Sequence, residues 1–310
     1  MGKIAFMFPG QGSQKTGMGK AFFDESMAAK KVFEAADTVL NKKISDICFY
    51  GTDEELKQTI NSQPAILTTS IAALEAFREK SDITPDYVLG HSLGEITAYY
   101  AAGVINLEDT LKLIKQRAYA MQSAAQKHEG KMAAIIKTDF ELIKECVDKT
   151  KGSVSIANYN SPQQIVITGE SKYVDDVCNE LIEKGAKRVV PLAVSGAFHS
   201  MLMVDAADKF ADYVKDITFN NANVSVITNV DAQKTIHAKD FKTKIIKQIY
   251  SSVKWTQSIQ NLINNSVDTF VEFGEGAVLS GLVKKISPES KVLNVSDMET
   301  LNNVADKLGV

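Results

Sequence analysis

The segment Gly90–Gly94 reads Gly-His-Ser-Leu-Gly and fits the G-x-S-x-G pattern of serine nucleophiles. An apolar strand pattern, Tyr87–Leu89, precedes it, and a helical pattern, Glu95–Ala102, follows it. A tight turn from strand to helix lifts the serine oxygen above the sheet, and the free N–H groups at a helix start favour an oxyanion. This context favours Ser92 as a nucleophile over the alternative, a serine in a purely structural turn.

A serine nucleophile needs a general base, and the chain has 4 histidines. His128 and His237 lie in polar stretches among lysines, where a solvated role is expected. His91 adjoins Ser92, but neighbours on a strand point to opposite faces, so His91 is predicted to pack behind the turn. His199 follows a predicted strand in a loop of small residues, a place that delivers side chains to a crevice. His199 is therefore the predicted base; the alternative is a histidine with structural hydrogen bonds only.

The segment Phe8–Gln14 lies between the first predicted strand and a helix, which is where phosphate-binding loops occur. Neither phosphate-loop pattern fits, because a dinucleotide loop would need glycine at Lys15 and a P-loop would need glycine at Gln14. A glycine-flanked turn remains. It is suited to presenting the backbone N–H of Gln11 to an anion, or it is only a tight structural turn.

Arg117 lies beside the apolar stripe of the predicted helix Leu107–Ala125. Partial burial of a guanidinium is costly without an anionic partner, because the group keeps its charge. Two explanations are open. Arg117 either reaches water or pairs with an acid of the protein, or it holds a substrate carboxylate in a bidentate contact.

The positions of these residues depend on a scaffold that apolar periodicity predicts to be α/β. Residues 127–196 read as β-α-β-β-α-β, the split-βαβ pattern, after a polar stretch at 126–131. Within it, Ser171 is placed to cap a helix and Gly185 to end it. We predict a parallel α/β core made of residues 1–126 and 197–310, with residues 127–196 inserted as a subdomain. The predicted helices are Gly19–Leu40, Ala65–Lys80, Leu93–Ala102, Leu107–Ala125, Phe140–Lys149, Tyr173–Lys184, Met201–Val214, Lys239–Ile249, Thr256–Asn264, Ala277–Ile286 and Asp297–Leu308, and the predicted strands are Lys3–Phe8, Asp86–Leu89, Met132–Ile136, Ser153–Asn158, Gln164–Thr168, Arg188–Val194, Val224–Thr228, Thr269–Phe273 and Lys291–Val295.

The composition is that of an ordinary folded protein: 310 residues, 45% hydrophobic and 24% charged. A formal net charge of -3 disfavours binding to nucleic acid or to an anionic membrane surface. The first apolar run is too short for a signal peptide, and no stretch approaches about 18 uninterrupted apolar residues. The 3 cysteines are far apart, which predicts neither a metal site nor a disulfide framework and indicates a reducing, cytoplasmic compartment.

Six separated motifs together resemble the bacterial malonyl-CoA:acyl carrier protein transacylase family. Their combination, in order and over nearly the full length, is far more specific than G-x-S-x-G alone. The resemblance implies an α/β-hydrolase-like core with an inserted ferredoxin-like subdomain, in agreement with the periodicity. The motifs are Phe8–Gln14, Gln63–Ala65, Gly90–Glu95, Gln116–Ala118, Asn160–Pro162 and Gly196–His199.

The resemblance also implies roles for individual residues. Ser92 would take a malonyl group from coenzyme A, with His199 as its base. The backbone N–H groups of Gln11 and Leu93 would form the oxyanion hole, and Arg117 would bind the malonyl carboxylate.

Four further residues follow from the same resemblance. The family orients its histidine with a glutamine backbone carbonyl in place of a triad acid, and the matching position is Gln248. Gln63 and Asn160 match residues that line the substrate pocket. Phe198, before the histidine, matches the malonyl-selecting version of this loop.

The implied activity is transfer of malonyl from malonyl-CoA to the phosphopantetheine thiol of acyl carrier protein, by a ping-pong route in fatty-acid biosynthesis. No tightly bound cofactor and no metal are expected, with coenzyme A as the product. Because the two predicted domains fill the chain, the carrier is expected as a separate protein. Basic residues at Lys187–Arg188 and Lys284–Lys285 are predicted to face the acidic carrier.

Three alternatives remain open. A free-standing acyltransferase of a polyketide or malonate-decarboxylase system would use the same residues. A serine esterase shares Ser92 and His199, but it does not require Arg117 or the turn at Gln11. A non-catalytic carrier-binding protein with a relic site is disfavoured, because the nucleophile, the base and Arg117 are all present.

Overall fold

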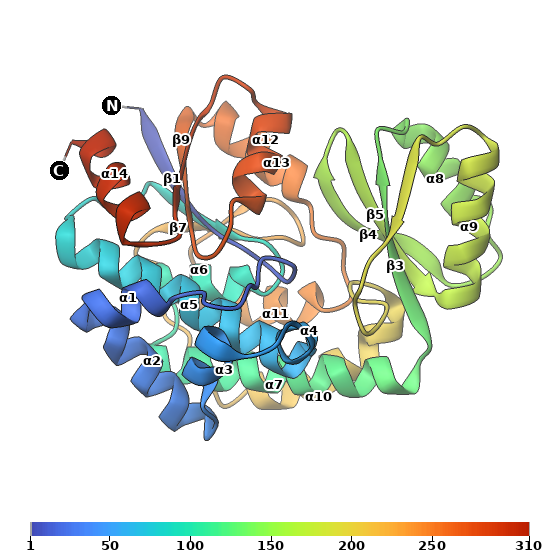
Figure 1. The fold of residues 1–310 in the computed structure, drawn as a ribbon. Coiled ribbons are helices and arrows are strands. Elements are labelled where there is room, and N and C mark those ends of the chain that lie inside the picture. The colour runs from blue at the N-terminus through green and yellow to red at the C-terminus, as the bar shows by residue number, and fades with distance from the viewer. Residues whose placement is uncertain (1, 310) are drawn as a thin grey trace.

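The computed structural model describes residues 2–309 and contains two β-sheets flanked by helices (Figure 1). The larger sheet has the strand order β10-β9-β1-β2-β7-β8. Its strands pair in parallel, apart from the short edge strand β8, which is antiparallel. The strands are β1 (Lys3–Phe8), β2 (Tyr87–Gly90), β7 (Ser225–Ile227), β8 (Lys234–Thr235), β9 (Val267–Phe273) and β10 (Lys291–Val295).

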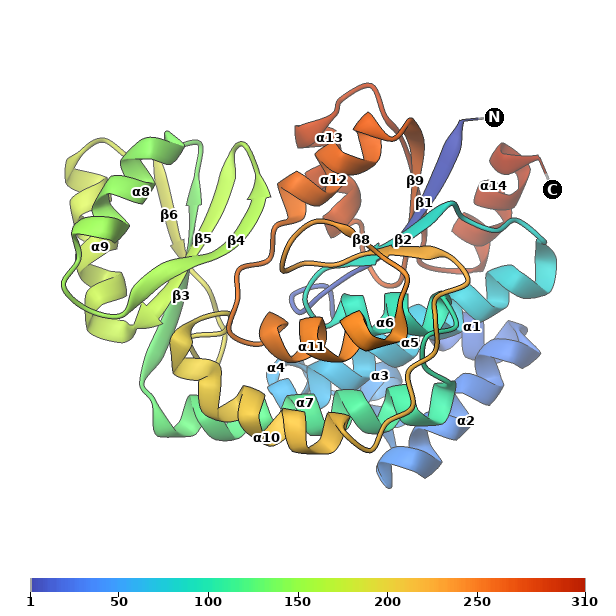
Figure 2. The same cartoon turned by 180° about the vertical axis from the view of Figure 1, so that it is seen from behind.

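Helices cover both faces of this sheet (Figures 1 and 2). One face carries α12 (Trp255–Asn264) and α13 (Val278–Ile286). The helices of the other side are α1 (Lys20–Glu25), α2 (Met27–Leu40), α3 (Ile44–Tyr50), α4 (Asp53–Lys57), α5 (Thr59–Lys80), α6 (Gly94–Ala101), α7 (Leu107–Lys127), the 3-10 turn η1 (Met201–Met203), α10 (Val204–Val214), α11 (Ala238–Gln248) and α14 (Met298–Leu308).

Strand β1 shows why helices pack on both faces of the larger sheet. It is apolar from Ile4 to Phe8, and all five of these residues are buried. Phe6 stacks edge-on against Phe77 of α5, whereas Met7 points to the opposite face, into the core that includes Trp255. A continuous apolar run of this kind is expected for a central parallel strand buried on both faces.

The smaller sheet is antiparallel, with the strand order β4-β5-β3-β6. Its chain order is β-α-β-β-α-β, and α8 and α9 pack on one face over a separate apolar core. The predicted fold class, a parallel α/β core with a ferredoxin-like unit, is confirmed; the boundaries at residues 127 and 196 stay a prediction. The elements are β3 (Gly130–Ile136), α8 (Phe140–Lys149), β4 (Val154–Ser161), β5 (Gln164–Glu170), α9 (Ser171–Glu183) and β6 (Arg188–Pro191).

Backbone hydrogen bonds join the smaller sheet to the loop after α11. The Tyr159 N–H donates to the Val253 carbonyl at 2.9 Å, and the Val253 N–H donates to the Ala157 carbonyl at 2.8 Å. The edge strand β4 therefore fixes the chain just beyond Gln248. This loop contributes to the candidate site described below.

The prediction of one helix over Gly19–Leu40 is wrong. α1 and α2 meet at Ser26, which has extended backbone, and the Ser26 hydroxyl accepts a hydrogen bond from the Ala29 N–H. A serine in this conformation caps the following helix and interrupts the preceding one, because its side chain replaces an intrahelical partner. The apolar periodicity continues across the break and conceals it.

The predicted helix start at Ala65 is also wrong, because α5 begins at Thr59 and contains Pro64. Proline removes one intrahelical bond, but almost every residue of this helix is buried, and tertiary packing outweighs that loss. Helices α3 and α4 were not predicted.

Three predicted boundaries in the region 171–214 differ from the structure. Ser171 does not cap α9 but is its first helical residue, after Glu170, which makes no side-chain cap bond. The strand predicted to reach Val194 ends at Pro191, because the Val194 N–H turns back to the Leu192 carbonyl. The predicted helix Met201–Val214 opens with the 3-10 turn η1, which Ser200 caps.

No helix among residues 2–309 is both long enough and apolar enough to cross a membrane.

Candidate active site

Ser92 lies in the turn between β2 and α6, at the C-terminal edge of the parallel sheet (Figure 2). Its φ is 52°, a left-handed conformation that is strained for a residue with a side chain. The flanking glycines permit this turn: a Cβ on Gly90 would lie 1.9 Å from the Gly94 carbonyl carbon, and a Cβ on Gly94 would lie 2.1 Å from the Phe8 carbonyl oxygen. Gly90 is therefore needed for the turn to fold back on itself, and Gly94 is needed for the turn to pack against the end of β1.

His199 is the hydrogen-bond partner of Ser92. Its Nε2 lies 2.8 Å from the Ser92 Oγ. Its Nδ1 lies 2.8 Å from the Gln248 carbonyl and 3.1 Å from the Ser251 carbonyl. Carbonyls only accept hydrogen bonds, so Nδ1 carries the proton and Nε2 is left to accept the serine proton.

The surroundings of His199 keep its imidazole neutral. Burial, and after it the positive charge of Arg117, lower the pKa of His199 to about 3, although the hydrogen bond to the Gln248 carbonyl opposes the shift. A neutral imidazole is the form that accepts a proton. His199 is therefore available as a general base at neutral pH.

Arg117 of α7 is fully buried beside this pair. One terminal nitrogen donates to the Gln63 side-chain oxygen at 2.8 Å; the other donates to the Gln248 side-chain oxygen at 2.9 Å and to the Ser92 Oγ at 3.1 Å. Burial lowers the pKa of Arg117 to about 10, so the guanidinium stays charged at neutral pH.

All of these partners of Arg117 are neutral. No carboxylate within residues 2–309 lies at ion-pair distance from the guanidinium, and its Nε has no partner there. The first explanation for Arg117 does not hold within residues 2–309, because the fully buried side chain does not reach the surface and no acid pairs with it. A buried cation without an anion is costly, and a bound anionic ligand would remove that cost.

A pocket of about 90 Å³ opens over Ser92, His199 and Arg117. This small volume suits a short acyl group. The backbone N–H groups of Gln11 and Leu93 have no acceptor within the described chain, so both are available as donors. The pocket is lined by Gln11, Gln63, His91, Ser92, Leu93, Arg117, Met121, Met132, Asn158, Leu192, Val194, Phe198 and His199.

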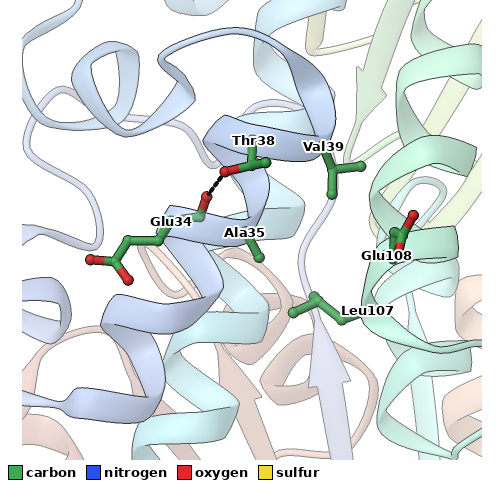
Figure 3. A pocket seen from close by; sticks show the side chains of 6 residues that line it. All are labelled: Glu34, Ala35, Thr38, Val39, Leu107 and Glu108. Atoms are coloured by element: carbon green, nitrogen blue, oxygen red, sulfur yellow. Dashed lines mark hydrogen bonds between the residues drawn. The ribbon is translucent and has the colours of Figure 1, made fainter.

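A larger, more open hollow lies between α2 and the start of α7 (Figure 3). Apolar side chains and two carboxylates line it, and the Thr38 hydroxyl is bonded to the Glu34 carbonyl of its own helix. No nucleophile with a base lies there. The smaller pocket at Ser92 is therefore the candidate active site.

His91 and Asn160 differ from their expected places. His91 was predicted to pack behind the turn, but it is among the residues that line the pocket. His91 Nε2 lies 2.8 Å from the Asn160 side-chain oxygen, and its ring packs on Trp255. Asn160 is thus buried behind His91, and Asn158 of the same strand lines the pocket instead.

Two residues at the site were missed in the sequence. Asn229, just after β7, bonds to the Gly90 carbonyl and the Ser92 N–H, and its own N–H donates to the buried Glu95 of α6. Site residues gather at the carboxyl ends of parallel strands. Asn229 follows β7, which pairs in parallel with β2, so this rule would have placed it at the same sheet edge as Ser92. His237 is exposed, and neither it nor His128 lines the pocket.

A serine on a strained turn, a neutral histidine and two free backbone donors define a serine acyl-transfer enzyme. Residues 5–304 match the family model for the acyl transferase domain, and the chain belongs to this family. The malonyl CoA-acyl carrier protein transacylase of Bacillus subtilis (strain 168) is 48% identical over 304 residues, which cover 97% of this chain and 96% of the relative. The enzyme of the same name from Staphylococcus aureus (strain COL) is 37% identical over 302 residues, which cover 96% and 97%.

Solved structures agree with these relatives. The acyl-carrier-protein-S-malonyltransferase of Bartonella henselae superposes with a TM-score of 0.96 at 37% identity, covering 99% of this chain and 100% of its own. A structure described as a type II PKS acyl-carrier protein in complex with its malonyl-transacylase gives a TM-score of 0.95 at 34% identity, with coverage of 98% and 99%. The whole chain, with both sheets, therefore has the fold of this group of enzymes.

Proposed function

We propose that this protein transfers the malonyl group of malonyl-CoA to the phosphopantetheine thiol of an acyl carrier protein, through a malonyl ester on Ser92. One observation carries the choice of acyl group. Arg117 is a fully buried cation with neutral partners, and its guanidinium lies 3.1 Å from the Ser92 Oγ. The carboxylate of a malonyl group attached to Ser92 would supply the missing anion. The names of the relatives support the same substrate and partner.

The acyl-enzyme forms in one addition and one elimination. The Ser92 Oγ attacks the thioester carbon while His199 Nε2 takes the hydroxyl proton. The N–H groups of Gln11 and Leu93 donate to the oxyanion, each worth about 3 kcal/mol by the effect of removing such donors. The C–S bond then breaks and coenzyme A leaves as a thiolate, a good leaving group because the pKa of its thiol is about 8.5. The His199 imidazolium gives its proton to that thiolate, so His199 is neutral again for the second half-reaction.

The second half-reaction reverses the first with another thiol. His199 takes the proton of the carrier's phosphopantetheine thiol, and the sulfur attacks the Ser92 ester. Collapse of the intermediate returns the proton to Ser92 and releases the malonyl thioester on the carrier. Since both half-reactions use one serine and one base, ping-pong kinetics follow.

The remaining site residues have supporting roles in this scheme. Gln63 holds the Arg117 guanidinium, and Asn160 holds His91 against the pocket. The Gln248 carbonyl orients His199, and Phe198 forms part of the apolar wall. The segment 127–196 acts as a subdomain that closes the pocket with apolar side chains such as Met132.

We assign the enzyme to fatty-acid biosynthesis in the cytoplasm. Coenzyme A enters and leaves as part of substrate and product, and the serine chemistry calls for no tightly bound cofactor. The likeness to a transacylase bound to a polyketide carrier protein supports one second candidate, the same transfer in polyketide assembly. Carrier docking at Lys187–Arg188 or Lys284–Lys285 stays a prediction.

Malonyl-CoA turnover with and without carrier protein separates transfer from hydrolysis. We expect coenzyme A release to become sustained only when holo-carrier is present, with one malonyl-carrier formed for each coenzyme A released. The reason is that the Ser92 ester waits in a small pocket for a thiol. Hydrolysis at a rate indifferent to the carrier would contradict the proposal and indicate a serine esterase.

The rate of acylation is expected to stay constant as the pH falls from neutral to mildly acidic. Because the pKa of His199 is lowered to about 3, its imidazole stays neutral well below pH 7. An ordinary histidine, with a pKa of about 6.5, would already be half protonated at about pH 6.5. We therefore expect kcat/KM for malonyl-CoA to show no histidine limb between about pH 8 and about pH 5.5.

Glu95 is the control for this profile, because burial raises its pKa to about 7 and it titrates in the same range. If the wild-type profile of kcat/KM falls at acid pH and the Glu95→Gln profile does not, the fall reports the titration of the Glu95 carboxyl group. A limb near pH 6.5 that persists in Glu95→Gln would contradict the neutral, buried His199.

A further inference from the structure

The turn that presents Ser92 is held by a side chain from a different strand end. Asn229 is almost fully buried, and its side-chain oxygen accepts the Ser92 N–H at 2.8 Å. Its side-chain nitrogen donates to the Gly90 carbonyl at 2.7 Å. One amide group thus bonds to two backbone groups on either side of His91, and so fixes the chain as it enters the strained Ser92.

We propose that Asn229 is a positioning residue for acyl transfer, whose side-chain amide clamps the turn so that the Ser92 Oγ and the Leu93 N–H face the pocket together. The inference rests on the proposed role of Ser92 as the nucleophile. Asn229 does not line the pocket, so it acts on the reacting atoms through the turn.

The chemistry of the clamp suits asparagine. The Ser92 N–H requires an acceptor and the Gly90 carbonyl requires a donor, and a primary amide offers both in one plane. If the Asn229 amide were rotated by 180°, its NH2 group would face the Ser92 N–H and its oxygen would face the Gly90 carbonyl, and neither pair can form a hydrogen bond. Aspartate would keep the acceptor and lose the donor, and alanine would lose both.

Asn229 itself is held in place from two sides. Its backbone N–H donates to the Glu95 carboxylate at 2.6 Å, and its carbonyl accepts the Lys254 N–H at 3.0 Å. Glu95 is buried in α6 and also accepts the Tyr99 hydroxyl at 2.6 Å. The clamp therefore connects the end of β7 rigidly to the helix that begins after the nucleophile.

The clamp also decides which backbone donors remain for the oxyanion. Because Asn229 engages the Ser92 N–H, that donor cannot face the pocket, and the free ones are those of Leu93 and Gln11. On the other side of the residue, the Gln248 side chain donates to the Ser92 carbonyl at 2.9 Å. Ser92 is thus fixed at both its N–H and its carbonyl, as a strained conformation at a reactive residue requires.

Single-turnover acylation of Asn229→Ala tests the clamp. We expect the rate constant to fall about 10²-fold, the loss associated with a misplacement of about 1 Å. The burst amplitude should stay near one acyl group per protein. Since Asn229 does not contact Arg117, the loss should be the same factor for malonyl-CoA and acetyl-CoA.

Asn261→Ala is the matched control. It removes an amide-to-carbonyl bond of 2.7 Å to Ala232 of the same loop, and a 2.9 Å bond that Asn261 accepts from the Asn265 side chain, both away from Ser92 and His199. Its acylation rate should stay within about twofold of wild type. Asn229→Asp keeps the side-chain volume and loses only the donor, so it provides the same measurement if the alanine variant folds poorly; its rate should also fall.

Three results would overturn the proposal: an unchanged acylation rate in both Asn229 variants, a reduced amplitude at a normal rate, or a loss confined to malonyl-CoA. The rate of Ser92 labelling by a small fluorophosphonate is measured in parallel. That probe needs an aligned serine but no malonyl recognition. If wild type reacts with the probe and not with malonyl-CoA, the proposed function fails, and the ratio of variant to wild-type labelling still decides the clamp.

Discussion

Replacing Ser92 by alanine is expected to abolish the acyl-enzyme and to lower malonyl transfer by at least about 10³-fold, within the range found when a serine nucleophile is removed. The Ser92 Oγ is the atom that His199 Nε2 contacts, so its removal leaves the base without a nucleophile. The fold should persist, because alanine needs no more space and meets the same backbone strain. Intact-protein mass spectrometry after exposure to malonyl-CoA measures the loss directly.

Ser195→Ala is the control for this variant. Ser195 is an exposed serine on the loop that leads to His199, and its hydroxyl is hydrogen-bonded to the Thr59 hydroxyl, away from Ser92. It should form the acyl-enzyme at the wild-type rate. An Ser92→Ala protein that still acquires one malonyl group in the same time would contradict the assignment of the nucleophile.

Replacing Arg117 by alanine should change which acyl group the enzyme accepts. Malonyl transfer should fall about 10³-fold, since losing one partner of a desolvated, hydrogen-bonded charge pair costs about 2–5 kcal/mol. Transfer from acetyl-CoA should fall much less, because an acetyl group has no carboxylate to lose a partner. The ratio of kcat/KM for the two substrates is therefore the quantity to measure.

The same variant predicts a second effect. The charge of Arg117 lowers the pKa of His199, so removing it should raise that pKa and move any acid limb of the acylation profile toward neutrality. Arg78→Ala is the matched control, because Arg78 bonds to Glu75 and Ala101 at the surface. Equal losses for malonyl-CoA and acetyl-CoA in Arg117→Ala would show that the guanidinium only supports the Ser92 turn.

The central strands and the nucleophile turn were predictable because their signals are local. An apolar run such as Ile4–Phe8 is dictated by burial on both faces. The glycines of the Ser92 motif are dictated by the tight turn, at Gly90, and by the approach of β1, at Gly94. The β-α-β-β-α-β order of the smaller sheet is likewise a property of consecutive segments.

The contacts that complete the site were not predictable in the same way. Arg117 meets Gln63 across 54 positions of sequence, and Ser92 meets Asn229 across 137. Hydrophobic periodicity records which face is buried and carries no information about which polar side chains meet. The neutral partners of Arg117 and the role of the Asn229 amide could therefore be recognised only from the three-dimensional structure.

The break at Ser26 shows a second limit, this one within a single helix prediction. A cap is decided by whether one hydroxyl turns toward a backbone N–H, and the apolar pattern of α1 and α2 is the same in either case. α5 shows the opposite case, because the helix continues through Pro64, where packing outweighs the lost backbone bond.

Mass spectrometry of peptides from the enzyme, after malonyl-CoA and then after holo-carrier protein, tests the central claim most directly. The account predicts one malonyl group on the peptide that contains Ser92. On addition of carrier it should vanish, as an equal amount of malonyl thioester appears on the carrier. A malonyl group on any other residue, or a Ser92 ester that is lost only as free malonate, would contradict it.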